Sequence, residues 1–396
     1  MFVSARIKNV PASPIRKLAG DVQKAKDLGK KIYPLNIGQP DIATPPVFFE
    51  AVKGYDVKTL AYGISQGNPE LIEAVRRYYE EWGIHYTKSN IYITNGGSEA
   101  LAFAVMCLCD VDDEVVMLEP FYANYKNFIN QYNVKVVPVP TSPENGYRLP
   151  DMATIEKAIT PRTKAILVSN PGNPTGMVFT EEEMEVLSQV VLKHNIVLIA
   201  DEVYREFVYD GKFNSFASRP ELEQNLIVID SVSKRFSACG ARIGCIISKN
   251  ALLDEQFEKC CQGRLCCPAL EQVGAAALYT TPPSYFQEVN EEYKRRRDTL
   301  RRELAKIPGI ISSEPQGAFY VMVKLPVDDT ETFARWMLTD FADQGDTVLI
   351  TPGYGFYEGE GKGLSEARLA YVINCEDLTR AIELLGKGLA QYNARK

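Results

Sequence analysis

Short apolar runs alternate with amphipathic stretches through the middle of the chain, and this alternation restricts the fold more than any other feature. Several of the runs are rich in Val and Ile, which favour strands. Strands that alternate with helices predict an α/β fold built on a mostly parallel sheet with helices on both faces. The seven expected strands are Ile91–Thr94, Glu114–Leu118, Lys135–Val139, Ala165–Val168, Ile196–Ala200, Leu226–Ile229 and Ile243–Ile247.

Helix signals lie between and after these strands. Thr180 to Glu183 have the capping-box pattern T-x-x-E, which predicts a helix that runs to about His194. The segment Cys260–Leu278 also has a helical pattern. Beyond Pro282-Pro283, the expected elements are a helix at Tyr285–Ile307, a strand at Gly317–Leu325, a helix at Glu331–Phe341, a strand at Ala367–Val372 and a closing helix at Asp377–Tyr392, capped at or near Asp377.

These elements predict two domains. The large domain, residues 46–284, is expected to hold the mostly parallel seven-stranded sheet and its covering helices. A smaller α+β domain is expected from the two ends of the chain. Residues 1–45 would form an arm and the start of this domain, and residues 285–396 would complete it.

The composition narrows the class of partner. The 396 residues carry a formal net charge of -7, which argues against nucleic acid because phosphate backbones require a basic surface. No apolar run approaches the ~20 residues needed to span a bilayer. The N-terminus lacks the apolar region of a signal peptide. We therefore expect a cytoplasmic protein that binds neither nucleic acid nor membrane.

The cysteines and histidines do not predict a metal site. Nine cysteines form an odd set in a long chain without an export signal, so a disulfide framework is not expected. In CCQGRLCC, Cys260–Cys267, the cysteines are adjacent pairs, a spacing that suits packing better than one tetrahedral ion. His85 and His194 are the only histidines and lie far apart in the sequence.

Polar residues follow the predicted strands at the point where each strand ends. In open α/β sheets, ligands bind beyond the carboxyl ends of the strands, so these side chains should meet in one pocket. The clusters are Gly96-Gly97-Ser98, Tyr122, Asn170 with Asn173, Asp201, and Ser231 to Lys234.

Each cluster also has a purely structural interpretation. A glycine pair before a helix is often only a tight turn, and an Asp after a strand is often a helix cap, which would account for Asp201. Tyr122 would pack in the core, and NPGNPTG would be a proline-locked loop. Lys234 alone would be a surface charge. The functional interpretation depends on all of them occurring together.

Together these residues contain the parts of a pyridoxal phosphate site. Lys234 can form a Schiff base with the aldehyde, and Asp201 can keep the pyridine nitrogen protonated. Tyr204 with Asn173 can donate to the phenolic oxygen, and Tyr122 can stack on the ring. Phosphate donors are available in Gly97, Ser98, Ser231 and Arg242. A dehydrogenase is not supported, because no G-x-G-x-x-G joins an early strand to a helix.

In this arrangement the chain resembles the fold-type I pyridoxal-phosphate enzymes, specifically the class I/II aminotransferases of the aspartate aminotransferase type. The resemblance covers nearly the whole chain in order. Its motifs are NIGQPD at Asn36–Asp41, YGISQG at Tyr62–Gly67, NGGSEA at Asn95–Ala100, NPGNPTG at Asn170–Gly176, DEVY at Asp201–Tyr204, SVSK at Ser231–Lys234 and ARLAYV at Ala367–Val372.

The resemblance implies a role for each matching residue. Lys234 would hold the cofactor and then move the proton, with a pKa lowered by its surroundings, while Ser233 would assist at the phosphate. Tyr62 would reach the phosphate of the partner subunit, which implies a homodimer with shared active sites. Arg368 would bind the substrate α-carboxylate bidentately, and Gly38 would offer its backbone N–H to the same group.

The implied activity is transfer of an amino group from an L-amino acid to a 2-oxo acid such as 2-oxoglutarate by a ping-pong mechanism. Aspartate is the favoured donor, with alanine or aromatic amino acids as alternatives. Ser98 stands where some relatives have a lysine that reads a dicarboxylate, and TGWR becomes CGAR, so the side-chain reader is not visible; Arg264 and Arg16 are candidates. A β-lyase acting on sulfur amino acids and, more remotely, a non-catalytic regulator remain open on the same fold.

Overall fold

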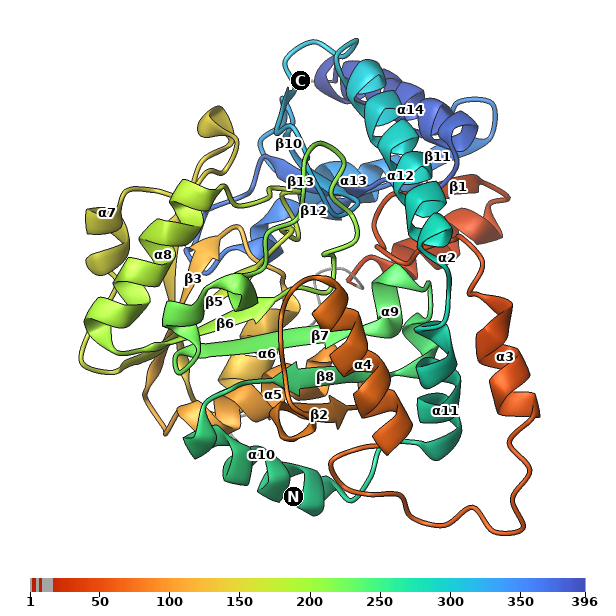
Figure 1. Ribbon diagram of the computed structural model, residues 1–396. Helices are drawn as coiled ribbons and strands as arrows, with labels where there is room; N and C mark the ends of the chain where they lie inside the picture. The colour runs from red at the N-terminus through yellow and green to blue at the C-terminus, as the bar shows by residue number, and fades with distance from the viewer. Residues whose placement is uncertain (1, 5–6, 9–16, 396) are drawn as a thin grey trace.

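The computed structural model describes residues 2–4, 7–8 and 17–395, and it confirms the α/β class. A seven-stranded sheet has the order β2-β8-β7-β6-β5-β3-β4 (Figure 1). Its neighbours pair in parallel except at β8, which is antiparallel to both β2 and β7. All seven predicted strands are present, as β2 (Ile91–Thr94), β3 (Glu114–Glu119), β4 (Lys135–Pro140), β5 (Thr163–Ser169), β6 (Val197–Asp201), β7 (Leu226–Ser231) and β8 (Gly244–Ile247).

Helices cover both faces of this sheet because successive residues of each buried strand point to opposite sides. In β3, Val116 joins a core that includes residues of α4, α8 and α11, whereas Val115 joins a core that includes residues of α5 and α10. The covering helices are α3 (Pro46–Lys53), α4 (Pro69–Glu81), α5 (Gly97–Leu108), α6 (Asn124–Asn130), α7 (Met152–Glu156), α8 (Glu181–His194), α9 (Val232–Arg235), α10 (Ala251–Arg264) and α11 (Ala269–Leu278).

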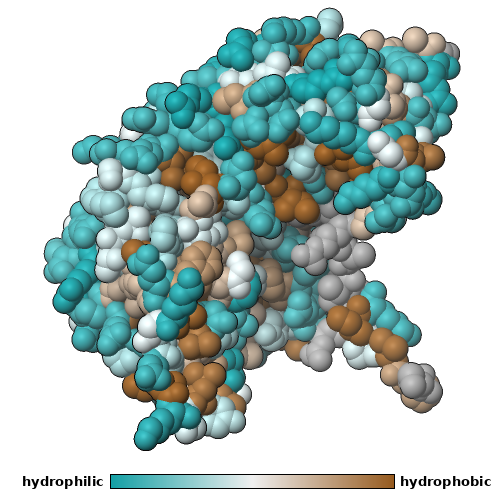
Figure 2. All heavy atoms as spheres, turned by 90° about the vertical axis from the view of Figure 1, so that its right-hand side faces the viewer, coloured by the Kyte–Doolittle hydropathy of each residue, from teal (hydrophilic) through white to brown (hydrophobic). Residues whose placement is uncertain are grey.

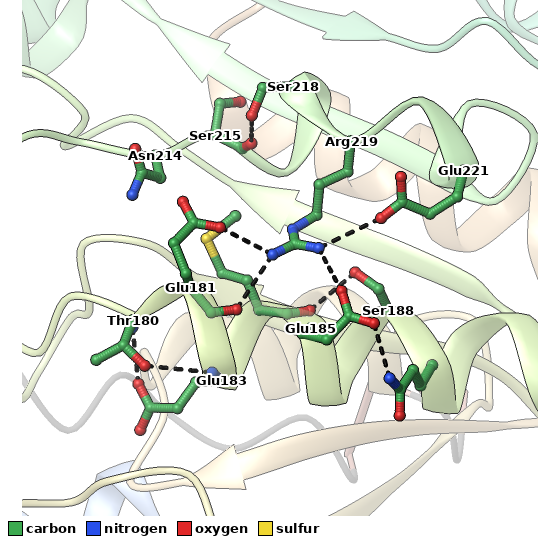
Figure 3. A network of polar contacts seen from close by, with 12 residues as sticks. Thr180, Glu181, Glu183, Glu185, Ser188, Asn214, Ser215, Ser218, Arg219 and Glu221 are labelled. Carbon is green, nitrogen blue, oxygen red and sulfur yellow. Dashed lines mark hydrogen bonds and ion pairs between the residues drawn. The ribbon is translucent and has the colours of Figure 1, made fainter.

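Helix α8 starts as its capping box predicts. Thr180 accepts a hydrogen bond from the Glu183 backbone, and the Glu183 carboxylate accepts one from the Thr180 backbone (Figure 3). Arg219 crosses over the same turn and pairs with Glu181 and Glu185 at 2.9 and 2.8 Å. Asn195 ends the helix in the left-handed conformation, with a φ of 48°.

The two ends of the chain fold together above the large sheet (Figure 1). Strand β1 (Lys31–Pro34) pairs in parallel with β11 (Asp346–Leu349), and helix α12 packs against α14. A four-stranded sheet has the order β12-β13-β10-β9. The remaining elements here are α2 (Ala19–Asp27), α12 (Pro283–Leu304), β9 (Ile311–Ser312), β10 (Tyr320–Lys324), α13 (Thr330–Thr339), β12 (Thr351–Pro352), β13 (Glu366–Ala370) and α14 (Cys375–Asn393). The domain boundaries at 45/46 and 284/285 stay predictions.

Two helix predictions differ from the structure. The helical segment over Cys260–Leu278 is divided between α10 and α11, because Leu265 takes a φ of 81° and Pro268, which has no backbone N–H, precedes α11. The closing helix begins at Cys375, and its N-cap is Asn374, whose side chain accepts from the backbone N–H of Asp377. Asp377 therefore lies within the first turn and is not the cap.

Two classes of feature are not found in the part of the chain that the structure describes. None of its helices is long and apolar enough to cross a membrane. Its His, Cys, Asp and Glu side chains form no group of three or more that could hold a metal ion. In the cluster of Cys260 to Cys267, Cys261 and Cys267 are buried in the cores on opposite faces of the sheet.

Candidate active site

A cavity of about 540 Å³ lies at the carboxyl ends of the large sheet's parallel strands, against β10 and β13. The structure brings together here the predicted site residues Gly38, Gly97, Ser98, Tyr122, Asn173, Asp201, Tyr204, Ser231, Ser233, Lys234, Arg242 and Arg368. Its other lining residues include Gln39, Asn124, Tyr125, Asn127, Cys239 and Tyr320. The convergence expected from the strand ends is therefore observed except at Asn170, which is fully buried, donates to the backbone of Asn214 and accepts from the backbone of Phe179.

Lys234 enters the cavity from the short helix α9, which follows β7 directly. Its Nζ donates to the carbonyl oxygen of Gly38 at 3.0 Å and lies 3.8 Å from the sulfur of Cys239. Burial lowers the pKa of Lys234, but the phenols of Tyr320 and Tyr122 and the Cys239 thiol outweigh burial, so the pKa is raised. The prediction of a lowered pKa is thus wrong for this arrangement, since acidic groups and a carbonyl surround the amine.

Asp201 is the last residue of β6 and faces the cavity. Its Oδ2 accepts a hydrogen bond from the hydroxyl of Tyr125 at 2.6 Å, and Oδ1 accepts from the backbone of Val203 at 3.3 Å. Burial raises the pKa of Asp201 to about 6, and these two hydrogen bonds oppose the rise. A positively charged ring nitrogen placed here would restore the carboxylate, so the residue fits the cofactor's pyridine nitrogen.

Arg368 lies in β13 and is 1% exposed. Its Nη1 donates to Asn173 Oδ1 at 3.0 Å, and its Nη2 donates to the backbone oxygen of Asn36 at 2.6 Å. The Nε of Arg368 is buried and has no hydrogen-bond partner among the described residues. A buried guanidinium N–H without a partner is costly, so this donor set suits a carboxylate ligand.

The end of the cavity at α5 suits a phosphate. Gly96 has a φ of 76°, which favours glycine, and a Cβ there would run into the guanidinium of Arg242. Gly97 and Ser98 form the first turn of α5, whose backbone N–H groups and helix dipole attract anions. Arg242 itself has a φ of 52° and donates to the backbone oxygen of Cys239 at 3.1 Å. These observations fit the dianionic end of pyridoxal phosphate.

Tyr122 and the face of α6 form a third wall. Asn124 donates to the Tyr122 hydroxyl at 2.8 Å, and the Tyr122 and Tyr125 rings meet edge to face at 5.3 Å. Further along, Asn127 and Gln131 also line the cavity, and Asn127 Oδ1 is buried without a hydrogen-bond partner in the described chain. This wall is polar but uncharged.

Several lining residues were not predicted from the sequence, among them Tyr125, Tyr320 and Cys239. Tyr125 lies three positions after Tyr122, a helical spacing that could have suggested a shared face. Tyr320 lies in GAFY, where the pattern predicted only a strand. Cys239 was noted as a departure in CGAR, but its place 3.8 Å from Lys234 Nζ depends on the fold of the following turn.

Three other candidates do not lie in this cavity. Tyr62 is 83% exposed and belongs to the long loop between α3 and α4, which extends away from the rest of the fold (Figure 1). Figure 2 views the molecule from that side and shows hydrophobic residues among a largely hydrophilic surface. Arg264 pairs with Glu99 at 2.9 Å and donates to the backbone of Ser65, so its guanidinium is occupied elsewhere. Arg16 lies outside the described residues.

This fold and this site define a fold-type I pyridoxal-phosphate enzyme. The family model "Aminotransferase class I and II" matches residues 30–385, and the chain belongs to that family. It is similar to the aspartate aminotransferase of Musicola paradisiaca, with 29% identity over 99% of this chain and 98% of that one. It is therefore a pyridoxal-phosphate-dependent aminotransferase of the aspartate aminotransferase type.

Solved structures show the same fold. An aspartate aminotransferase from Thermotoga maritima has a TM-score of 0.89 at 28% identity, covering 98% of this chain and 100% of that chain. An alanine aminotransferase from Pyrococcus furiosus also has a TM-score of 0.89, at 30% identity and the same two coverages. The fold is thus shared by relatives named for different amino donors.

Proposed function

We propose that this enzyme moves an amino group from an L-amino acid, with aspartate favoured, to a 2-oxo acid such as 2-oxoglutarate by a ping-pong mechanism. The observation that carries the proposal is the common placement of Lys234 and Arg368. Both face one cavity, and both donate to the backbone of the Asn36–Gly38 segment, at 3.0 and 2.6 Å. A reactive amine and a carboxylate-binding guanidinium thus meet where an amino acid would lie.

Pyridoxal phosphate, when bound, supplies the electron sink that makes the Cα proton of an amino acid labile. Lys234 would hold its aldehyde carbon, Asp201 its ring nitrogen, and Tyr204 with Asn173 its phenolic oxygen. Tyr122 would cover one face of the ring. The phosphate would be held by Gly97, Ser98, Ser231, Ser233 and Arg242, and by Tyr62 of a second subunit.

The substrate's α-carboxylate would lie on Arg368 and on the backbone N–H of Gly38. Arg368 is held in place by Asn173 and Asn36, so little side-chain entropy is lost when the ligand binds. Lys234 would then move the proton at Cα, accepting it as a free amine and returning it as an ammonium. Its raised pKa makes the neutral amine a stronger base for this step, because the protonated form is stabilised by its surroundings.

The aspartate aminotransferase of Musicola paradisiaca supports aspartate as the donor, whereas the structural relative from Pyrococcus furiosus is named for alanine. The cavity itself offers a second carboxylate few cations. Among the described lining residues, Lys234, Arg242 and Arg368 are the only cations, and each already has a role. The side chain would therefore be read by the uncharged wall of Asn124, Asn127 and Gln131 or by the second subunit.

A homodimer with shared active sites is part of the proposal. The segment between α3 and α4 carries a row of exposed apolar side chains that the described part of the chain does not cover: Tyr55, Val57, Leu60, Tyr62 and Ile64. Such a row marks an interaction surface. Sedimentation of the purified enzyme as a monomer, with full activity, would contradict this part.

The test is a panel of L-amino acids with 2-oxoglutarate, scored by the change in visible absorption of the bound cofactor and by the 2-oxo acid formed. Aspartate should give oxaloacetate and glutamate. If aspartate fails while alanine or aromatic amino acids react, the donor is wrong but the reaction class stands. Release of pyruvate and ammonia without an acceptor would identify a β-lyase, and a protein without visible cofactor absorption would support a regulator.

A further inference from the structure

Tyr320 occupies the centre of the site, although nothing in the sequence pattern marked it. It is the first residue of β10 and is 2% exposed. Its hydroxyl group donates to the carbonyl oxygen of Gly38 at 3.4 Å, and its oxygen lies 3.0 Å from the hydroxyl oxygen of Tyr204. The same carbonyl accepts the hydrogen bond from Lys234 Nζ at 3.0 Å.

These contacts extend into a chain with one consistent donor direction. Arg368 donates to Asn173 Oδ1, and Asn173 Nδ2 donates to the Tyr204 oxygen at 3.3 Å. Because the Tyr204 oxygen accepts there and the Tyr320 proton points to Gly38, Tyr204 donates to Tyr320 in the cofactor-free protein. The same Tyr204 proton would turn to the phenolic oxygen when pyridoxal phosphate binds. The chain therefore runs from the guanidinium that binds the substrate to the carbonyl that receives the lysine amine.

The close approach of Gly38 and Tyr320 shows that this packing is tight. A Cβ on Gly38 would overlap the Tyr320 hydroxyl and the edge of its ring. The ring itself lies under Arg368, whose guanidinium carbon is 4.5 Å from the ring centre. A phenylalanine would retain the ring contact and lose only the two contacts of the hydroxyl, so the two roles are separable.

We infer that Tyr320 is a positioning residue whose hydroxyl fixes the Gly38 carbonyl as the docking point of the Lys234 amine and links it to Tyr204, Asn173 and Arg368. The inference rests on the proposed function, in which Lys234 and Arg368 act on the same substrate. Tyr320 would contact neither the Cα proton nor the cofactor carbon. It would instead hold the Gly38 carbonyl, to which the Lys234 amine donates.

The pKa of Lys234 can be used to test the contact between Tyr320, the Gly38 carbonyl and the lysine amine. The titratable groups that face its amine are Tyr320 on β10, Tyr122 before α6, Cys239 after α9, Arg368 on β13 and Asp201 on β6. After burial, which lowers the pKa of Lys234, Tyr320 is the largest influence and raises it. Removal of the Tyr320 hydroxyl should therefore lower the pKa of Lys234.

The experiment compares the full-length wild type with Tyr320→Phe. After the cofactor is stripped, the rate of pyridoxal phosphate uptake is followed by visible absorption from neutral pH to about pH 11, because only the neutral amine reacts and the pKa of Lys234 is raised above its ordinary value of 10.5. The midpoint of the variant should fall, and its uptake near neutral pH should rise about threefold or more, since the neutral fraction changes tenfold per pKa unit. In the loaded enzyme, kcat should fall about five- to tenfold, the effect of one hydrogen bond, with KM little changed.

Tyr371→Phe is the matched control. Tyr371 is also fully buried and donates its hydroxyl to a backbone oxygen, that of Ala318 at 3.3 Å, but it does not line the cavity. It should leave the uptake profile and kcat unchanged. If Tyr320→Phe behaves like Tyr371→Phe in both readouts, Tyr320 only fills space and the inference is wrong.

Two further outcomes separate the possible failures. A wild type that takes up no pyridoxal phosphate would defeat the proposed function and the inference with it, whereas normal uptake by the wild type with no effect of Tyr320→Phe would defeat the inference alone. If Tyr320→Phe fails to fold, Gly38→Ala is the second variant, because its Cβ would displace the Tyr320 hydroxyl. It should also lower the pH midpoint of pyridoxal phosphate uptake. An unchanged midpoint in a folded Gly38→Ala protein would overturn the inference.

Discussion

Two buried polar regions, the active-site cavity and a cluster of buried ions, contain adjacent residues of the same chain segments. Asp201, Tyr204, Ser231 and Lys234 line the active-site cavity. The neighbouring residues in the sequence, Glu202, Arg205, Asp230 and Arg235, form what we call the closed ion cluster, and each is at most 1% exposed. Adjacent residues of one segment thus serve opposite purposes.

The two regions differ in how their polar groups are satisfied. In the closed ion cluster, Arg235 pairs with Asp230, which also accepts from the Tyr79 hydroxyl at 3.1 Å. Glu202 accepts from the Ser215 hydroxyl at 2.7 Å. Both regions also hold buried atoms without a hydrogen-bond partner among the described residues: Arg368 Nε and Asn127 Oδ1 in the cavity, and Arg235 Nε and Nη1 in the cluster. The guanidinium of Arg235 lies 4.3 Å from the ring centre of Tyr78, whereas Arg368 and Asn127 border open space that a ligand can enter.

Arg205 extends the cluster with aromatic rather than polar contacts. None of its three side-chain nitrogens has a hydrogen-bond partner among the described residues. Its guanidinium instead lies 4.5 Å from the ring centre of Tyr79 and 4.8 Å from that of Trp82. Such rings attract a cation through their faces, so the cluster holds a second buried charge without a second ion pair.

The sharpest test of the comparison is Lys234→Ala. Because Lys234 is expected to act on the cofactor and the Cα proton, transamination should fall by at least ~10²–10⁴-fold. The free energy of unfolding should change by less than about 1 kcal/mol, since the side chain borders a cavity. Activity is measured with the best donor of the panel, and unfolding by denaturant titration.

Lys259→Ala on the exposed face of α10 is the control and should change neither quantity. Near wild-type transamination in Lys234→Ala would mean that another group carries the proton, and the assignment of the cavity would fail. A large loss of stability would instead show that the cavity and the closed ion cluster are not separate in function.

Local sequence patterns predicted the strands and most of the cavity, because strand ends and motifs such as SVSK concern residues close in sequence. Tyr125 and Tyr320 were missed because their partners, Asp201 and Tyr204, lie 76 and 116 positions away. The closed ion cluster was missed for a further reason. Charged residues predict exposure, and the burial of Arg205 and Arg235 becomes apparent only when α4 covers them.

The second prediction concerns Arg235→Met, which should lower the free energy of unfolding by about 3–5 kcal/mol, because it leaves Asp230 buried without its partner. Adding Asp230→Asn should restore part of this loss, since the double variant buries no unpaired charge at this pair. Urea titration of the four proteins in the cycle gives the coupling energy. Simple additivity of the two single losses would show that the pair is not coupled.

The third prediction uses pH to distinguish the cluster from ordinary surface carboxylates. Burial raises the pKa of Glu202 from 4.5 to about 7. As pH rises above 4.5, the unfolded chain loses this proton before the folded protein does, so the stability present below pH 4.5 is lost by about pH 7. The loss is up to ~3 kcal/mol.

Glu202→Gln cannot titrate at this position, so its stability relative to wild type should improve steadily from pH 4.5 to pH 7. The measurement is denaturant unfolding of both cofactor-free proteins across that range. Parallel pH curves for the two proteins would mean that Arg205 keeps Glu202 ionised throughout, and the closed ion cluster would then hold four full charges.

The smallest loss of unfolding free energy is expected for a substitution of Arg219. Comparison with Arg235 tests whether the burial of an ion pair, and not the number of ion pairs, sets an arginine's contribution to stability. Arg219 has three carboxylate partners, Glu181, Glu185 and Glu221 (Figure 3). Among the described residues, Arg235 pairs with one carboxylate, that of Asp230. The partners of Arg219 are 60%, 50% and 41% exposed, so water solvates them when the arginine is removed. Arg219→Met should therefore cost less than about 1 kcal/mol despite its larger number of ion pairs. If denaturant titration instead finds a loss as large as that of Arg235→Met, the number of partners, and not burial, sets the contribution of an arginine in this fold.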